Sequence, residues 1–278
     1  MANPMFTDTA FQRVGGTGTL DAPPPPPGFS PAGAPAAPHA ERRTGTMTIG
    51  GTCSATGLML VVLVIGAFFG WNQVTETTVQ TTRGLANTAD LDSPGLLIAG
   101  LLVALGLAFL TAFRPHLAKF TALPYALVEG YVVGAISHLY DVQFNGIVIQ
   151  AVIATVGVFA VMLLLYGLRI LRATPRFTKG VIAATCGVAL IYLVGFIFQL
   201  FGSDIDIFHS TSLLSIGFSL VVVVIASMNL ILDFDFVERG TAEGLSKDME
   251  WYGAFGLIVT VVWLYLEILR LLSKLRSR

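Results

Sequence analysis

Seven long apolar stretches, separated by short polar connectors, constrain the fold of this chain more than any other feature. They cover approximately residues 53–71, 95–113, 123–140, 146–168, 180–201, 212–232 and 251–272. Each has about 18 to 23 residues, the length that an α-helix needs to cross a bilayer at about 1.5 Å per residue. Helices satisfy their own backbone hydrogen bonds in lipid, so we expect an all-α integral membrane protein with seven transmembrane helices.

The composition agrees with a membrane protein and argues against several other classes. Of the 278 residues, 54% are apolar and 12% are charged, whereas about 25% of the residues in soluble domains are charged. The formal net charge of −1 lacks the basic surplus that nucleic-acid binding requires, so we expect no nucleic-acid partner. Cys53 and Cys186 belong to no CxxC motif or Cys/His cluster, so we expect no zinc or redox site and no cofactor.

The N-terminal segment differs from the rest of the chain. Residues 1–48 are rich in Pro, Gly, Ala and Thr, and five prolines occupy positions 23–27. Each proline fixes φ and removes a backbone donor, so we expect a disordered, partly polyproline II tail. A plain solvated tail is the simplest interpretation, and a ligand for a proline-recognition domain is the alternative. We therefore divide the chain into a tail, 1–48, and a membrane domain, 49–278.

The distribution of lysine and arginine predicts the orientation in the membrane. With the N-terminus in the cytoplasm, the basic connectors, such as the one with Arg169, Arg172 and Arg176, are cytoplasmic, and the opposite loops carry Arg83. The four basic residues at the C-terminal end, 270–278, disagree with this orientation. Either the charge rule is overridden there, or the last apolar stretch is re-entrant and the C-terminus is cytoplasmic. We expect seven spans and a cytoplasmic N-terminus.

Several ionisable residues lie at similar depth near the cytoplasmic ends of the spans. Glu129 is six residues into the third span, Asp233 and Asp235 follow the sixth, and Arg114 ends the second. Charges inside a bilayer are costly, so each needs a partner, a water-filled cavity or a function. Close carboxylates cannot all ionise at low dielectric, so this layer would respond to pH, and Ca²⁺ prefers oxygen ligands of this kind. In the simpler interpretation, Asp233 and Asp235 mark the end of a helix at the headgroups.

A second pair of ionisable residues lies toward the opposite face. His138 and Glu267 are both about 22 to 24 Å from the cytoplasmic starts of their helices, which suggests an outer layer with a histidine, the side chain that titrates nearest physiological pH. In the simpler interpretation, His138 hydrogen-bonds a neighbouring helix and Glu267 pairs with Arg270, three residues later.

The sequence offers little for an enzyme. The motifs HExxH and GxSG are absent, and the Tyr140–Asp141 pair lacks the GxGD segment that an intramembrane aspartyl protease also needs. We therefore expect no enzymatic activity.

Five segments carry a family resemblance. They are TMTIGGTCSATGLMLVVLVIGAFFGW, YALVEGYVVGAIS, RATPRFTKGVIAATCG, LILDFDFVERG and AFGLIVTVVWLYLEILRLL. Through them, residues 46–275 resemble the Bax inhibitor-1 (transmembrane Bax inhibitor motif, YccA-like) family, especially its actinobacterial branch, and the N-terminal tail lies outside the resemblance. The resemblance implies six helices around a central seventh, and a pH-regulated leak of cations, notably Ca²⁺.

The resemblance also implies a pair of acids. In bacterial members with this activity, an aspartate near the end of the sixth helix pairs with one in the seventh. The first matches Asp233 or Asp235, but Thr260 stands at the position of the second. Glu267 lies two turns beyond Thr260 on nearly the same face and is one substitute; Glu129, from a neighbouring helix, is the other.

The residues and the resemblance together predict a pH-sensitive leak channel or transporter for Ca²⁺ or H⁺ in a bacterial inner membrane. Membrane-embedded carboxylates would gate it, with Arg114 as a latch, and a proton that breaks a pair would shift the closed and open states. The alternative is a non-transporting regulator in the bilayer that binds a membrane protease or another protein, as YccA-like relatives suggest.

Overall fold

The structure, a computed structural model, describes residues 45–81, 84–91, 93–200 and 212–278. The predicted disordered tail lies outside the described residues, apart from its last four positions. The helices are α2 (Ile49–Trp71), α3 (Pro94–Phe113), α4 (Ala118–Gln143), α5 (Ile147–Gly167), α6 (Pro175–Leu200), α8 (Leu213–Ala242) and α9 (Met249–Arg276), with a short 3₁₀ helix, η2 (Pro115–Leu117), before α4. In the described part of the chain, seven helices are long and apolar enough to cross a membrane, which confirms the predicted fold class.

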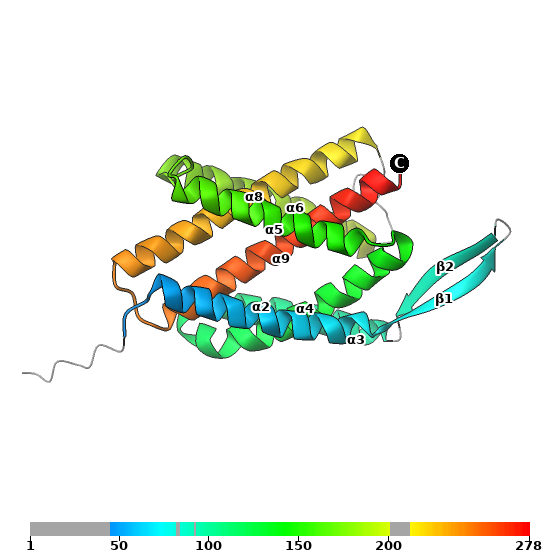
Figure 1. Cartoon of the computed structure of the whole chain (residues 1–278), viewed down its shortest axis with the longest axis horizontal. Coiled ribbons are helices and arrows are strands. Elements are labelled where there is room, and N and C mark those ends of the chain that lie inside the picture. Colours follow the sequence, from blue (N-terminus) through cyan, green and yellow to red (C-terminus); the bar gives the residue numbers. More distant parts are fainter. Residues whose placement is uncertain (1–44, 82–83, 92, 201–211) are drawn as a thin grey trace, which may run out of the picture. The chain divides into compact units, whose positions relative to one another are not determined.

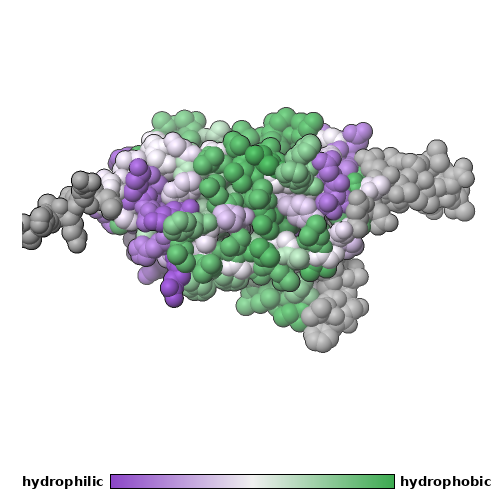
Figure 2. Space-filling model, turned by 90° about the horizontal axis from the view of Figure 1, so that it is seen from below, coloured by the Kyte–Doolittle hydropathy of each residue, from purple (hydrophilic) through white to green (hydrophobic). Residues whose placement is uncertain are grey.

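The surface of the helices is that of a protein in lipid. Large apolar side chains are exposed along α2, α3, α5 and α6, among them Phe68 at 66%, Ile153 at 66% and Phe196 at 62%. Figure 2 shows hydrophobic residues gathered over the middle of one face and hydrophilic residues toward both ends. An apolar surface of this extent is unfavourable in water and matches the hydrocarbon core of a bilayer.

Helix α9 is the central helix of the bundle, as the family resemblance implied. It packs against α2, α4, α5 and α8, while α3 packs against α4 and α6 packs against α8. Figure 1 shows α9 running between α2 on one side and α5 and α8 on the other. Ile258, Leu264 and Leu269 of α9 are completely buried. A polar group on α9 is therefore placed in the interior of the protein.

Four glycines allow α2 and α4 to pack closely. A Cβ added to Gly66 or Gly70 would overlap the backbone of α4, and one added to Gly130 or Gly134 would overlap the backbone of α2. The two GxxxG pairs of the sequence therefore face each other across a single helix interface, as expected for a motif that lets helix backbones approach.

The last helix is continuous, which excludes the re-entrant alternative. Helix α9 has 28 residues, a length of about 42 Å. Near its start, Glu250 accepts hydrogen bonds from Thr48, just before α2. At its end, Arg276 donates to the carbonyl oxygen of Asn145, between α4 and α5. The start of α2 and the end of α9 therefore lie at opposite ends of the bundle.

The connector between α2 and α3 forms a β-hairpin that the sequence analysis did not predict. Strands β1 (Val74–Thr81) and β2 (Gly84–Leu91) pair in antiparallel register, with Val74 opposite Leu91 and Thr81 opposite Gly84. Threonine and valine, which favour strands, are frequent in β1. The all-α prediction holds for the spans but not for this connector.

Candidate functional site

Asp233 on α8 lies against the central helix. Its carboxylate lies beside the hydroxyl group of Thr260 on α9. Its Oδ2 atom is shielded from solvent and has no hydrogen-bond partner among the described residues. A Cβ added to Gly256, one turn before Thr260, would lie 3.3 Å from Oδ1 of Asp233. One face of α9, with Gly256 and Thr260, thus forms the contact surface for this carboxylate.

Both aspartates of the sixth span lie inside a helix. The span was expected to end at residue 232, but α8 continues to Ala242. Neither acid therefore ends the helix, and their position at the level of the headgroups stays a prediction.

Asp235 faces a different group from Asp233. Its Oδ2 atom lies 2.8 Å from Nε of Arg239, one turn later on α8, and the Asp235 side chain is 21% exposed. Arg239 also donates to the carbonyl oxygen of Ala173, in the connection between α5 and α6, at 3.1 Å. Of the two acids that the resemblance left open, Asp233 is the one that contacts the seventh span.

Glu129 and Arg114 do not join Asp233 in one cluster. Glu129 is half-buried on α4 and forms no hydrogen bond or ion pair with another described residue. One turn before it, the ring of Tyr125 packs edge-on against Phe255 of α9, with centroids 5.0 Å apart. Arg114 is exposed at the end of α3. In the described ranges no three His, Cys, Asp or Glu side chains are placed to hold a metal ion, so the expected inner layer is not a compact cluster.

His138 joins α4 to the end of α2. Its Nδ1 atom lies 2.7 Å from the carbonyl oxygen of Trp71, and the two rings are stacked with centroids 4.4 Å apart. This geometry matches the simpler interpretation, a histidine that hydrogen-bonds a neighbouring helix. It does not bring His138 into contact with Glu267.

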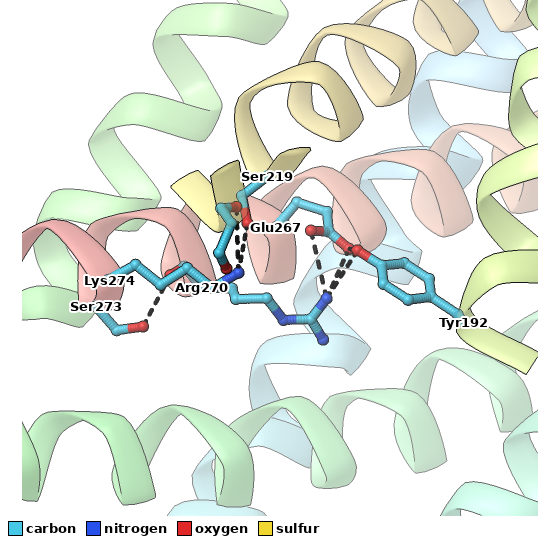
Figure 3. A network of polar contacts seen from close by, with 7 residues as sticks. Tyr192, Ser219, Glu267, Arg270, Ser273 and Lys274 are labelled. Carbon is cyan, nitrogen blue, oxygen red and sulfur yellow. Dashed lines mark hydrogen bonds and ion pairs between the residues drawn. The ribbon is translucent and has the colours of Figure 1, made fainter. Parts of the chain in front are cut away.

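Glu267 belongs to a buried polar network on α9. Tyr192 of α6 donates to Oε1 of Glu267 at 2.7 Å, and Arg270 lies 3.3 Å from the same oxygen. Arg270 also donates to the hydroxyl oxygen of Tyr192 at 2.8 Å, as Figure 3 shows. The structure thus contains the ion pair between Glu267 and Arg270 that the simpler interpretation predicted. Glu267 is therefore not the partner of Asp233. The residue of α9 beside Asp233 is Thr260.

Two further basic residues at the end of α9 also have partners inside the protein. Lys274 is 6% exposed, and its Nζ atom donates to the hydroxyl group of Ser219 on α8 at 2.9 Å (Figure 3). Arg276 donates to the carbonyl oxygen of Phe144 at 3.0 Å. With Arg270 paired as well, three of the four basic residues at this end form contacts within the protein.

The sequence analysis missed one buried acid. Glu250 is 5% exposed, and its Oε1 atom accepts hydrogen bonds from the backbone N–H of Thr48 at 3.0 Å and from its hydroxyl group at 2.9 Å. A Cβ added to Gly51 would overlap the Glu250 carboxylate. The acid directly precedes the predicted start of the seventh span, at residue 251, and was counted with the connector.

Comparison with known proteins identifies the family. The profile of the Bax inhibitor 1 like family matches residues 3–277. This match is longer than the resemblance over residues 46–275 and includes the N-terminal segment. Searches of curated proteins and of solved structures found no match. Together with the seven apolar helices, the family match makes this a multi-pass membrane protein, and the chain belongs to the Bax inhibitor 1 like family.

Proposed function

We propose that this protein is a pH-sensitive leak channel or transporter for cations, Ca²⁺ or H⁺, with Asp233 as its pH-sensing group. The observation that carries the proposal is the carboxylate of Asp233 between α8 and α9, whose Oδ2 atom is shielded from solvent and has no hydrogen-bond partner in the described part of the chain. A group of this kind inside a membrane protein is costly unless it has a function. The family match supports a membrane protein of the Bax inhibitor type.

The two protonation states of Asp233 require different surroundings. A protonated carboxyl group is neutral, and the hydroxyl group of Thr260 and the apolar contacts around it are sufficient to accommodate it. An ionised carboxylate needs more donors, water or a cation around its free oxygen. Raising the pH therefore favours an arrangement in which water or a cation enters between α8 and α9. We expect cation flux to rise with pH through the titration of Asp233.

Glu129 is the second candidate for the ion pathway. It is half-buried on α4, a helix that packs against α9, and it has no ion-pair partner among the described residues. The exposed position of Arg114 gives no support to a latch at that residue. No catalytic group or cofactor has a part in the proposed function.

The proposed location is a bacterial inner membrane with the N-terminus in the cytoplasm. The arginine-rich connection between α5 and α6 is then cytoplasmic, in agreement with the charge rule. At the C-terminal end, Arg270 pairs with Glu267, and Lys274 and Arg276 donate to oxygens of the protein, which weakens the objection from that end.

Calcium flux into liposomes tests the proposed function. The purified full chain is reconstituted around a fluorescent Ca²⁺ indicator, and flux is followed from pH 6 to 8 beside empty liposomes. Wild type should pass Ca²⁺ faster at the higher pH, and Glu129→Gln should reduce the flux at every pH. A folded protein with no flux above empty liposomes, for Ca²⁺ or for protons, would reject the leak and favour the regulator that binds a membrane protease or another protein.

A further inference from the structure

A polar cavity lies between the end of α5, the connection to α6 and the last turns of α8. Its volume is about 570 Å³. Its polar lining includes three arginines, two acids and a tyrosine: Arg169, Arg172, Arg239, Asp235, Glu238 and Tyr166. We call this cavity the arginine pocket. It is separate from the Asp233 contact, which faces α9.

The two acids of the arginine pocket are already engaged. Asp235 pairs with Arg239 at 2.8 Å. Glu238 accepts a hydrogen bond from Tyr166 and lies 3.9 Å from Arg169. Three arginines thus face two paired carboxylates, which leaves one positive charge in excess.

Arg172 carries the charge that has no acidic partner. Its Nε atom donates to the carbonyl oxygen of Arg169 at 3.3 Å, and no carboxylate in the described ranges lies within ion-pair distance of its guanidinium group. A guanidinium group presents several N–H donors in a planar fork that matches the oxygens of a phosphate group. The pocket therefore has a free donor set for an anion of this geometry.

An apolar groove adjoins the arginine pocket. The groove has a volume of about 370 Å³ and is lined by Ala160, Leu163, Leu164, Gly167 and Leu168. Gly167 lines both the groove and the pocket. The side chains of Leu168 and Ile170, on either side of Arg169, are 61% and 64% exposed. Basic and apolar surfaces thus meet at the end of a membrane-spanning helix, as they do where a lipid headgroup meets its acyl chains.

We propose that the arginine pocket and its groove bind one anionic phospholipid, with the phosphate group at Arg172 and Arg169 and an acyl chain along α5. Basic pockets between transmembrane helices are a known setting for anionic headgroups. The groove favours a lipid over free phosphate, because inorganic phosphate has no part that would occupy it. The proposal does not depend on the leak activity.

Lipid retention by the purified full chain tests this site. The protein in detergent is incubated with phosphatidylglycerol or with phosphatidylcholine of the same acyl chains, and bound lipid is counted by native mass spectrometry. Wild type should retain phosphatidylglycerol in preference to phosphatidylcholine. Arg172→Gln should weaken retention about fivefold, the contribution expected of one arginine at an anionic surface, and adding Arg169→Gln should weaken it further. Arg172→Gln breaks no ion pair, so the fold is expected to survive.

Two controls separate a pocket from general charge and a lipid from free phosphate. Arg176→Gln removes one exposed charge at the start of α6, outside the pocket lining, and should leave retention unchanged. Ala160→Phe fills the groove and should weaken retention with every arginine in place, while excess inorganic phosphate should not displace the lipid. Equal retention by wild type and Arg172→Gln, or no preference for phosphatidylglycerol, would overturn the proposal. Displacement by inorganic phosphate with no effect of Ala160→Phe would assign the pocket to free phosphate instead.

Discussion

The hydroxyl group of Thr260 on the central helix α9 lies beside the carboxylate of Asp233 on α8. The family resemblance implied a second aspartate at the position of Thr260. A pair of close carboxylates shares its protons and titrates in two coupled steps. A carboxylate beside a hydroxyl group titrates as one site, so we expect the pH dependence of this protein to follow a single step.

The first prediction concerns the hydroxyl group itself. Thr260→Val keeps the volume and removes the hydroxyl group beside Asp233, which makes the ionised carboxylate harder to accommodate. The rise in Ca²⁺ flux should move to higher pH by about one unit, because a hydrogen bond to a charged group contributes about 1.5 kcal/mol or more. Flux in liposomes from pH 6 to 9 measures the shift. Thr260→Ser, which retains the donor, should behave like wild type; an unchanged profile in Thr260→Val would show that the hydroxyl group has no part in sensing pH.

The second prediction concerns the packing of α2 against α4. Gly66→Ala and Gly130→Ala each place a methyl group into the opposing backbone and should destabilise the protein by about 2 kcal/mol. Gly57→Ala, on α2 with nothing within 4 Å of the added atom, is the matched control and should be neutral or slightly stabilising. Unfolding in detergent, followed by circular dichroism, measures all three. Equal stability of Gly66→Ala and Gly57→Ala would contradict the close approach of the two helices.

The third prediction concerns the network of Glu267, Arg270 and Tyr192. Glu267→Gln leaves the guanidinium group of Arg270 partly buried without a carboxylate, which should cost about 3 kcal/mol of stability. The exposed pair of Lys119 and Asp248, 3.1 Å apart, provides the comparison, and Asp248→Asn should cost less than about 1 kcal/mol.

The same variants distinguish a structural role of Glu267 from a sensing role. Folded Glu267→Gln should retain the rise in Ca²⁺ flux with pH, because Glu267 does not contact Asp233. A Glu267→Gln protein of wild-type stability that has lost this rise would assign Glu267 to the sensor.

The fourth prediction concerns topology. In a background with Cys53→Ser and Cys186→Ser, single cysteines at Lys247, between α8 and α9, and at Arg278 should lie on opposite sides of the membrane. A membrane-impermeant thiol reagent added outside intact cells should label Arg278→Cys, whereas Lys247→Cys should be labelled after permeabilisation. Labelling of both positions from outside, or of neither, would contradict the placement of α9 across the membrane.

The membrane spans could be predicted from the sequence because the length of each apolar stretch determines them. The ends of the helices could not be predicted where polar residues pair with one another and the helix continues beyond the apolar stretch. The segment after residue 232 contains two aspartates, a glutamate and an arginine, and looks like a connector. Asp235 pairs with Arg239 one turn later, so α8 continues to Ala242. The hairpin after α2 was missed for a related reason, since a threonine-rich connector lacks the alternation of apolar and polar residues that marks a half-buried strand.

The site was predicted in part. Asp233 and Thr260 were both named from the family resemblance, but the choice between Asp233 and Asp235 was open. Residues two positions apart point about 200° away from each other around a helix. The sequence alone therefore does not determine which of the two aspartates faces α9. The packing of α8 against α9 decides between them, and that packing depends on the whole bundle. The partners of Glu267 and Glu250 depend in the same way on contacts between helices distant in the sequence.

The pH dependence of Ca²⁺ flux in Asp233→Asn is the most direct test of the proposed role of this residue. The asparagine is neutral at every pH and has nearly the shape of the protonated acid, so flux should stay at the low-pH level of wild type from pH 6 to 8. Asp235→Asn, with the same substitution two residues away and a carboxylate that faces Arg239, should keep the rise with pH. A wild-type profile in folded Asp233→Asn would contradict the assignment of Asp233 as the pH sensor.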